Sequence, residues 1–327
     1  MPVATRTETL DDLYTTTWNN RKNSITDSIF TGIPLYNALK SKGSLKIDGT
    51  GGRYIEIPIQ YAKNETVVSL GRGGTVSLSD TKFLTVAQYT WKFVAGSIVR
   101  YFTDDSQNKS IQAHLNWANK KIDNLRDSMS DAFETYLFGD GTGNGGLDPQ
   151  GLDAIVTTTP TTGTLGNIAR ATNTYWRNSQ KTASGAASAY LISDMRNLAN
   201  TISEGQTRKY PDMIVTTQTV AELYDDEVLE QRQIVNQTKG DADFEWQAGG
   251  TAWKGIPIMW SSICPAGRMY MLNSEFLGLN TDPDINFMMT QWKYVPNQVE
   301  DRVAQIVWKG ELITSRPRGL GVLTGIA

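Results

Sequence analysis

The chain has 327 residues, of which 39% are hydrophobic and 20% charged, so it can form a packed core and suggests about two domains. Its 31 basic and 34 acidic residues give a net charge of -3, which argues against a basic protein whose main task is to coat nucleic acid. A single cysteine, Cys264, and a single histidine, His114, exclude an intrachain disulfide and a zinc site built from Cys and His ligands.

These two single residues are expected to be structural. Cys264 is predicted to be a small buried apolar residue, and His114 to lie at the flank of a long helix, as neither ligand nor base. The N-terminal sequence lacks the apolar region of a signal peptide, and the longest apolar stretches are far shorter than the ~20 residues of a membrane span. We therefore expect a soluble cytoplasmic chain with no cofactor and no metal site.

The N-terminal region contains little that can form a core. Residues 1–23 are polar and rich in threonine, which predicts an extended arm that is ordered only where it lies on something else. A short amphipathic helix is expected next, disturbed by Gly32 and Pro34. Its apolar residues are Ile25, Ile29, Ile33 and Leu39.

Residues 53–99 predict a β-hairpin. RYIEIPIQY alternates between apolar and polar residues, and Pro58 places this strand at a sheet edge. A polar, glycine-containing stretch over residues 62–82 leads to a second β-prone run, KFLTVAQYTWKFVAGSIV. This middle stretch has too few apolar residues for a core of its own, so the hairpin is expected to project from the body. From the pattern alone, an ordinary meander within a sheet is an equally good interpretation.

A long amphipathic helix is the clearest predicted element. Apolar residues recur at alternating spacings of four and three from Ile111 to Tyr136, which predicts about 27 helical residues and a length of ~40 Å. Gly139 is expected to end this helix. Trp117 lies off the apolar stripe, which indicates a second contact surface.

The stretch GDGTGNGG, residues 139–146, directly follows this helix. It matches G-x-G-x-x-G, but a dinucleotide site must open a helix, whereas the dipole at a helix C-terminus repels phosphate. As a calcium loop counted from Asp140, it has Gly151 at the twelfth position, where the bidentate acid is required. We therefore expect a turn that reverses the chain.

Residues 147–290 are predicted to form a compact α/β unit. SGAASAYLISDMRNLANTIS is expected to be helical, and a strand over Met213–Thr216 is followed by a helix in which Thr219 and Glu222 are spaced as a capping box. TAWKGIPIMWSS and GRMYMLNSEFLGLN predict two strands joined by a Pro-Gly turn, and QVEDRVAQIVWKGELITSRPRG predicts one or two returning strands.

The order of these elements, and four stretches in particular, carry a resemblance to a known family. The stretches are YLFGDGTGNGGLDPQGLDAIV, DMIVTTQTVAELY, WKGIPIMWSSICPAGRMYMLNSEFLGL and DRVAQIVWKGELITSRPRGLGVLTGI. Together they resemble the major capsid proteins of tailed double-stranded DNA bacteriophages, which share the Hong-Kong-97-type fold. The resemblance covers nearly the whole chain and depends on element order more than on signature residues.

The resemblance implies an α+β Hong-Kong-97-type capsid fold with four parts. Residues 1–45 would be an N-terminal arm with a short helix, and residues 46–105 an extended β-hairpin loop. Residues 106–138, as a long spine helix, and residues 291–327 would form the peripheral domain. Residues 139–290 would be the axial domain, which meets its copies around five-fold and six-fold axes. Arm and hairpin would lie on neighbouring subunits.

The implied function is structural and non-enzymatic: self-assembly, as hexamers and pentamers, into an icosahedral phage head that encloses double-stranded DNA and contacts it non-specifically. The implied partners are a portal protein, an optional decoration protein and a separate scaffolding protein, because the chain begins directly at the arm. No membrane partner is expected. The location is the virion, after assembly in the bacterial cytoplasm.

Three tryptophans, Trp91, Trp117 and Trp308, are the predicted subunit contacts, while most other aromatic residues are expected in the core. Some relatives cross-link a hairpin lysine to a neighbouring asparagine. Lys63 and Lys82 flank this hairpin, but nothing in the local sequence marks either as reactive.

Two alternatives remain open at the level of the sequence. An encapsulin-like compartment would have the same fold around a cargo enzyme, although the polar arm and the lack of a cargo-docking feature disfavour it. A two-domain carbohydrate-active enzyme would use paired carboxylates, and 34 acidic residues allow this although no acidic cluster stands out.

Overall fold

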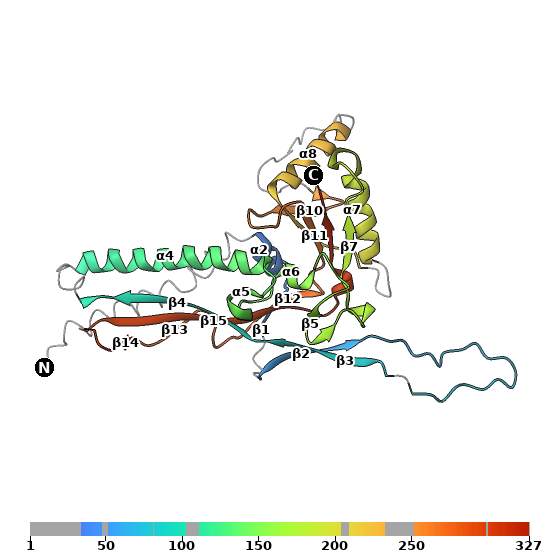
Figure 1. The fold of residues 1–327 in the computed structure, drawn as a ribbon, viewed down its shortest axis with the longest axis horizontal. Coiled ribbons are helices and arrows are strands. Elements are labelled where there is room, and N and C mark those ends of the chain that lie inside the picture. Colours follow the sequence, from blue (N-terminus) through green and yellow to red (C-terminus); the bar gives the residue numbers. More distant parts are fainter. Residues whose placement is uncertain are drawn as a thin grey trace.

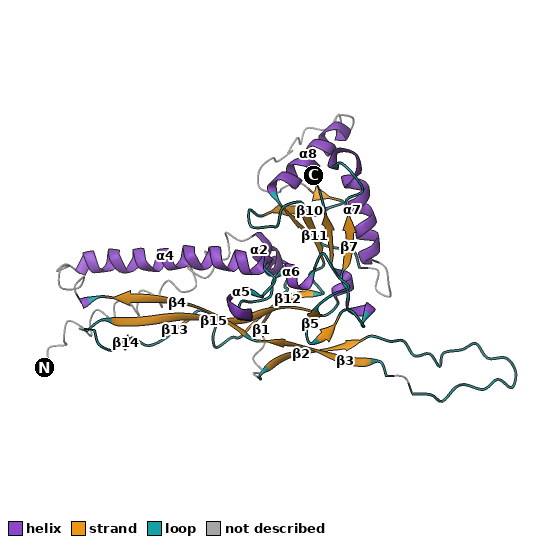
Figure 2. Ribbon diagram, in the orientation of Figure 1, coloured by secondary structure: helices purple, strands orange, loops and turns teal. Residues whose placement is uncertain are grey.

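The structure is a computed structural model that describes residues 34–47, 52–80, 82–102, 111–203, 209–232, 252–298 and 300–326. It is a mixed α+β chain with an elongated body, an upright second sheet and a projecting hairpin (Figure 1, Figure 2). The predicted arm over residues 1–23 lies outside the described residues.

A six-stranded sheet forms the elongated body. Its strands are β1 (Leu45–Ile47), β4 (Lys92–Arg100), β12 (Leu277–Thr281), β13 (Met288–Met289), β14 (Lys293–Tyr294) and β15 (Arg302–Thr314). The long strand β15 is central: β4 runs antiparallel along one edge, and β14, β13 and β12 follow one another along the other edge. β1 adds to β12 in parallel. Segments from three distant parts of the chain therefore share one sheet.

Helix α4 (Ile111–Phe138) lies along this sheet (Figure 1). Its 28 residues correspond to ~42 Å, and it ends where the sequence predicts, just before Gly139. Among its described side chains, Ile122, Met129 and Phe133 are buried, and the ring of Phe133 meets the indole of Trp308 edge-on at 4.7 Å between centroids. The alternating spacing of the apolar residues thus predicted the helix correctly, because one face of the helix packs on the body sheet.

A second six-stranded sheet stands beside the first. Its strands, in sheet order, are β7 (Ser179–Thr182), β16 (Gly321–Thr324), β11 (Arg268–Leu272), β8 (Met213–Thr216), β10 (Ile256–Trp260) and β9 (Ala252–Trp253). Helices α7 (Ala187–Ser203) and α8 (Gln218–Arg232) cover one face (Figure 1). Ile214 packs in the cluster with these helices, whereas Met213 and Val215 belong to the main core. The centre of the sheet is therefore buried on both faces, and all of β8 is buried.

The pairing of the strands differs from the sequence-based expectation in three ways. β10 and β11 are not neighbours, because β8 lies between them. β12 belongs to the body sheet, although it falls within the predicted unit over 147–290. The C-terminal strand β16 lies inside the second sheet. A local pattern predicts a strand but not its pairing partner. Each of the two sheets therefore contains strands from both sides of the domain boundary that is expected near residue 290.

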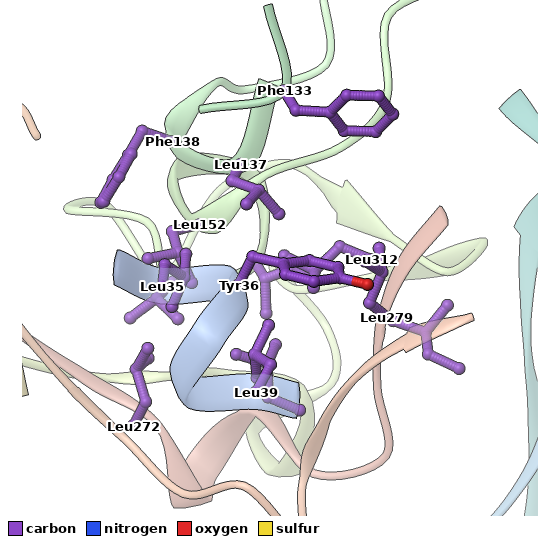
Figure 3. Close-up of a cluster of buried hydrophobic side chains, with 14 of the residues drawn as sticks. Leu35, Tyr36, Leu39, Phe133, Leu137, Phe138, Leu152, Leu272, Leu279 and Leu312 are labelled. Atoms are coloured by element: carbon purple, nitrogen blue, oxygen red, sulfur yellow. The ribbon is translucent and has the colours of Figure 1, made fainter. Parts of the chain in front are cut away.

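Helix α2 (Pro34–Ser41) joins the two sheets through the main core. Leu35, Tyr36 and Leu39 are buried among leucines from β11, β12 and β15 and aromatic residues of α4 (Figure 3). Pro34 does not disturb this helix but begins it, since its missing N–H is not needed in the first turn. The predicted helical residues before Pro34 lie outside the described residues.

Helix α8 (Gln218–Arg232) begins two positions earlier than the expected capping box requires. The hydroxyl of Thr217 accepts a hydrogen bond from the backbone N–H of Val220 at 3.4 Å, so Thr217 is the cap. Glu222 instead accepts a hydrogen bond from the side chain of Gln218 at 2.8 Å. The predicted capping box at Thr219 is therefore wrong, because Thr217, two residues earlier, caps the helix.

The hairpin consists of β2 (Tyr54–Gln60) and β3 (Leu84–Thr90), which pair only with each other. The chain between them extends away from the body (Figure 1), so the projecting interpretation is confirmed over the ordinary meander. Near the hairpin lie four short elements: β5 (Thr164–Leu165), β6 (Ile168–Ala169), and the 3-10 turns η1 (Thr174–Trp176) and η2 (Pro317–Gly319).

The glycine-rich stretch forms the turn that the sequence predicts. Asp140 accepts hydrogen bonds from the backbone N–H and hydroxyl of Thr142, which lowers the pKa of its carboxyl. Positive φ angles at Gly141, Asn144 and Gly145 then reverse the chain through α5 (Gly143–Gly146). Helix α6 (Leu152–Ile155) follows directly. No group of three acidic, His or Cys side chains suited to a metal occurs in the described part of the chain.

Gly151 closes this turn against the end of α4, and Gly151→Ala is expected to lower the free energy of unfolding by roughly 3 kcal/mol. An added Cβ would lie 2.2 Å from the carbonyl oxygen of Tyr136 and 2.7 Å from the backbone of Gly139. Backbone atoms cannot rotate away, so the helix end must shift. Urea unfolding followed by tryptophan fluorescence measures the effect. Gly71→Ala is the control, because nothing lies within 4 Å of its Cβ position, and equal stabilities of both variants would contradict the clash.

Candidate interaction surface

The loop of the projecting hairpin exposes apolar side chains without a core of its own. The most exposed are Leu78, at 98%, and Val67, at 82%. The neighbouring apolar residues Val68, Leu70 and Val76 are also exposed. Tyr61 N still donates to the carbonyl of Phe83 across the hairpin at 3.0 Å. Between residues 62 and 80 the chain forms no strand, and its hydrogen bonds in the described structure are local, such as that from Gly74 N to the carbonyl of Gly71. An apolar surface of this kind is typical of a contact site.

The root of the hairpin, in contrast, is firmly held. The hydroxyl of Tyr89 donates to the carbonyl of Thr314 at the end of β15 at 2.9 Å, and burial raises the pKa of that hydroxyl. Gln88 N donates to the carbonyl of Gly166 in the β5–β6 turn at 2.9 Å. Gly166 has φ +55°, and a Cβ there would lie 3.1 Å from both Ala87 and the Tyr89 ring. The body therefore positions a rigid root beneath an apolar loop.

A groove of about 600 Å³ lies beside this root. One wall is the end of β2 with the residues that follow it, and the other is the segment around η2 together with η1. The lining residues are Pro58, Ile59, Gln60, Tyr61, Ala62, Lys63, Tyr175, Trp176, Ser315, Arg316 and Arg318. Three of them are basic and none is acidic. The sequence did not reveal this groove, because its walls come from three separate segments.

Two of the three predicted contact tryptophans lie inside the subunit. Trp91 is 6% exposed, with the ammonium of Lys309 over its ring at 4.6 Å, and Trp308 is 2% exposed. Trp117 lies in α4, and its side chain is outside the described residues, as is that of His114. A contact role for these tryptophans stays a prediction, but Trp91 and Trp308 clearly belong to the subunit core.

The remaining residues that the sequence singled out show no sign of chemical reactivity. Cys264 is buried, as predicted, and burial raises the pKa of its thiol to about 12, which makes it unreactive. Lys63 and Lys82, which flank the hairpin, are both exposed. Among the described helices, none is long and apolar enough to cross a membrane.

Glu311 is a buried carboxyl that no pattern in the sequence predicts. It lies in β15 and is 1% exposed. One carboxyl oxygen accepts a hydrogen bond from Gln150 N at 2.7 Å, while the other has no hydrogen-bond partner in the described structure. Burial raises the pKa of Glu311 to about 8, although the charge of Lys92 opposes this shift. Lys92 donates to the carbonyl of Gly146. The group therefore lies where the glycine-rich turn meets the body sheet, and no local sequence signal marks it.

Comparison with known proteins gives no match in sequence but clear matches in structure. No protein-family model matches the chain, and no curated protein matches it either. The capsid asymmetric unit of cyanophage A-1(L) is similar, with a TM-score of 0.63 and 19% identity, over 88% of this chain and 92% of that one.

Two further solved structures extend this likeness. The capsid of the native GTA particle has a TM-score of 0.53 and 12% identity, over 88% of this chain and 90% of that one. The holo-SrpI encapsulin complex from Synechococcus elongatus PCC 7942 has a TM-score of 0.51 and 11% identity, over 88% and 87%. Since each match spans most of both chains, the expected Hong-Kong-97-type capsid fold is confirmed at the level of the overall α+β fold.

Proposed function

We propose that this chain is the major capsid protein of a tailed double-stranded DNA bacteriophage, a structural subunit that assembles into an icosahedral head. The observation that carries the proposal is the combination of a capsid fold with an exposed apolar hairpin on a rigid root. Such a hairpin gains its burial from a second copy of the chain. Subunits of one kind close into a shell through many weak contacts that act together.

In this proposal the parts of the chain take the roles that the resemblance implies. Residues 1–45 form the arm, residues 46–105 the extended hairpin loop, and α4 the spine helix. The body sheet with α4 forms the peripheral domain, and the second sheet with α7 and α8 forms the axial domain. β12 pairs in the body sheet and β16 in the second sheet, which supports assigning β12 to the proposed peripheral domain and β16 to the proposed axial domain.

The proposed partners follow from the assembly. Hexamers and pentamers of the chain itself form the shell, a separate scaffolding protein guides it, and a portal protein occupies a special vertex. A decoration protein is a further optional partner. The packaged DNA is contacted non-specifically, and the net charge of -3 fits a wall that encloses DNA without gripping it, because phosphate contacts by Lys and Arg dominate non-specific affinity.

An encapsulin-like compartment is the second candidate, since an encapsulin complex is among the similar structures. It differs in content: such a shell would contain a protein cargo, whereas a phage head contains DNA. No specific observation favours the carbohydrate-active enzyme. Neither the groove at the hairpin root nor the one between α4 and β4 is lined by a carboxylate.

Assembly mass is the direct test. We expect the chain, expressed alone and with its candidate scaffold gene, to form megadalton shells or tubes, measured by light scattering and negative-stain imaging. Nuclease-protected DNA in particles isolated from infected cells separates a head from a cargo compartment. A monomer or dimer at high concentration with the scaffold present would overturn the capsid proposal.

A further inference from the structure

The glycine-rich turn after α4 contains the only Asn-Gly pair of the sequence, Asn144 followed by Gly145. Both residues are exposed, and nothing lies within 4 Å of the position of a Cβ on Gly145. The backbone nitrogen that follows an asparagine can attack the side-chain amide, because the two groups are close enough to close a five-membered ring. A glycine leaves that nitrogen uncovered, since it has no side chain. The turn therefore places an exposed amide beside an exposed nucleophile.

Neither of these two groups is held by a hydrogen bond in the described part of the chain. Gly146 N donates to the carbonyl of Thr142 at 3.1 Å. Leu147 N donates to the backbone carbonyl of Asn144 at 3.4 Å. The N–H of Gly145 and the side-chain amide of Asn144 take no part in these bonds. A backbone N–H that donates no hydrogen bond can lose its proton to solvent, which is the first requirement for attack.

A second pair in the same turn, Asp140 followed by Gly141, is protected from the same ring closure. Thr142 donates to the Asp140 carboxyl from its backbone N–H at 2.9 Å and from its hydroxyl at 2.8 Å. These two bonds lower the pKa of the carboxyl and keep it ionised. Ring closure at an aspartate needs the protonated acid, because the group that leaves is water. The structure thus separates two neighbouring pairs that look alike in sequence.

We propose that Asn144–Gly145 is a site of spontaneous deamidation with water as the co-reactant. The nitrogen of Gly145 forms a bond to Cγ of Asn144, the bond from Cγ to Nδ2 breaks, and the Nδ2 group leaves as ammonia with the proton of the Gly145 N–H. Water then opens the cyclic imide. Opening at Cγ gives aspartate, and opening at the backbone carbonyl gives isoaspartate. The reaction takes place in the free subunit and does not depend on the proposed assembly.

The turn can reach the ring-closing geometry at low cost. Closure requires rotation about the Cα–C bond of Asn144, whose ψ angle is 42°. Glycines lie on both sides of this residue, and exposed turns open with little free energy.

Both products would change the turn. Isoaspartate adds a methylene to the main chain between Thr142 and Gly146, whose hydrogen bond spans residue 144. Either product also adds a carboxylate to a turn that already contains Asp140 and Asp148. We therefore expect the modified turn to hold the end of α4 less firmly.

Peptide mapping of the full-length chain by mass spectrometry, after incubation at neutral pH, tests the proposal. Asn144 is expected to gain about 1 Da about tenfold faster than Asn167. Asn167 is the matched control: it is exposed with φ +64°, but it precedes the buried Ile168, and its amide donates to Gln88 at 3.4 Å. Conversion of Asn144 in the folded chain should proceed within about tenfold of the rate in the urea-unfolded chain.

The variant Asn144→Gly accepts the same positive φ and has no amide to lose, so its peptide should gain no mass. Aged wild type should unfold at a lower urea concentration than fresh protein, whereas Asn144→Gly should not change on ageing. Conversion of Asn144 only in the unfolded chain would overturn the proposal, because the folded turn would then lock the amide. Equal conversion of Asn144 and Asn167 would overturn it too, since exposure alone would then decide reactivity. An equal loss of stability in both aged proteins would contradict the expected effect on the turn.

Discussion

Leu78→Asp is expected to abolish assembly at wild-type concentrations while leaving the fold of the subunit unchanged. Leu78 is 98% exposed on the hairpin loop, so within one subunit it contributes nothing to the core. In the proposed shell the loop would gain burial against a second copy. The substitution removes that burial and places a carboxylate at the contact.

The size of the effect follows from transfer free energies. Burial of a leucine contributes roughly 1.5–3 kcal/mol, and a carboxylate left without a partner in an interface costs more than this. Each 1.4 kcal/mol changes an association constant about tenfold. Leu78→Ala should therefore raise the concentration needed for assembly about tenfold, and Leu78→Asp more than 100-fold. Light scattering over a concentration series measures both.

Ser77→Asp is the matched control, because it places the same charge on the neighbouring exposed residue without removing an apolar side chain. We expect it to assemble within a few-fold of the wild-type concentration. If Leu78→Asp forms shells as readily as Ser77→Asp, the apolar loop is not a contact between subunits. If Leu78→Asp unfolds at a lower urea concentration than the wild type, the loop serves the subunit itself.

Elements with a strong local pattern were predictable from the sequence. The apolar stripe of α4 fixed the helix, because one face is buried on the body sheet, and the alternation in β2 fixed an edge strand. Strand partners were not predictable. β8 lies between β10 and β11, and β16 returns to the second sheet, because pairing depends on contacts between residues far apart in sequence.

The candidate surface was predictable only in outline. A polar stretch without a core predicted a projecting hairpin, but not that Leu78 and Val67 are its most exposed apolar residues. The sequence marks Trp117 as a contact because it lies off the apolar stripe of α4, but it gives no such signal for Trp91 and Trp308, which are buried in the subunit. Residue type alone does not separate a core aromatic residue from an interface aromatic residue.

Glu311 illustrates a feature that only the structure reveals, and it carries a prediction for pH. Its carboxyl has a pKa of about 8 in the folded chain because burial penalises the charged form. In the unfolded chain the same carboxyl has its ordinary value of 4.5. The folded state therefore holds the proton more tightly than the unfolded state.

The sign of the stability change follows from this difference. Below about pH 4.5 both states are protonated, and the folded chain carries no penalty from Glu311. As pH rises from about 4.5 to about 8, the unfolded chain has released the proton while the folded chain retains it, so the free energy of unfolding falls. Above about pH 8 the loss is complete, with a limit of roughly 5 kcal/mol set by the difference between the two pKa values.

Glu311→Gln removes this proton equilibrium while keeping the shape of the side chain and an oxygen for Gln150 N. We expect the variant to match the wild type near pH 5 and to be the more stable of the two by roughly 2–5 kcal/mol at pH 8.5. Urea unfolding of dilute subunits at both values measures this, and exposed Glu65→Gln should change neither. Equal pH dependence of Glu311→Gln and wild type would show that Glu311 is already charged at neutral pH. The charge of Lys92, which opposes the shift caused by burial, would then outweigh the cost of burying the charged carboxyl.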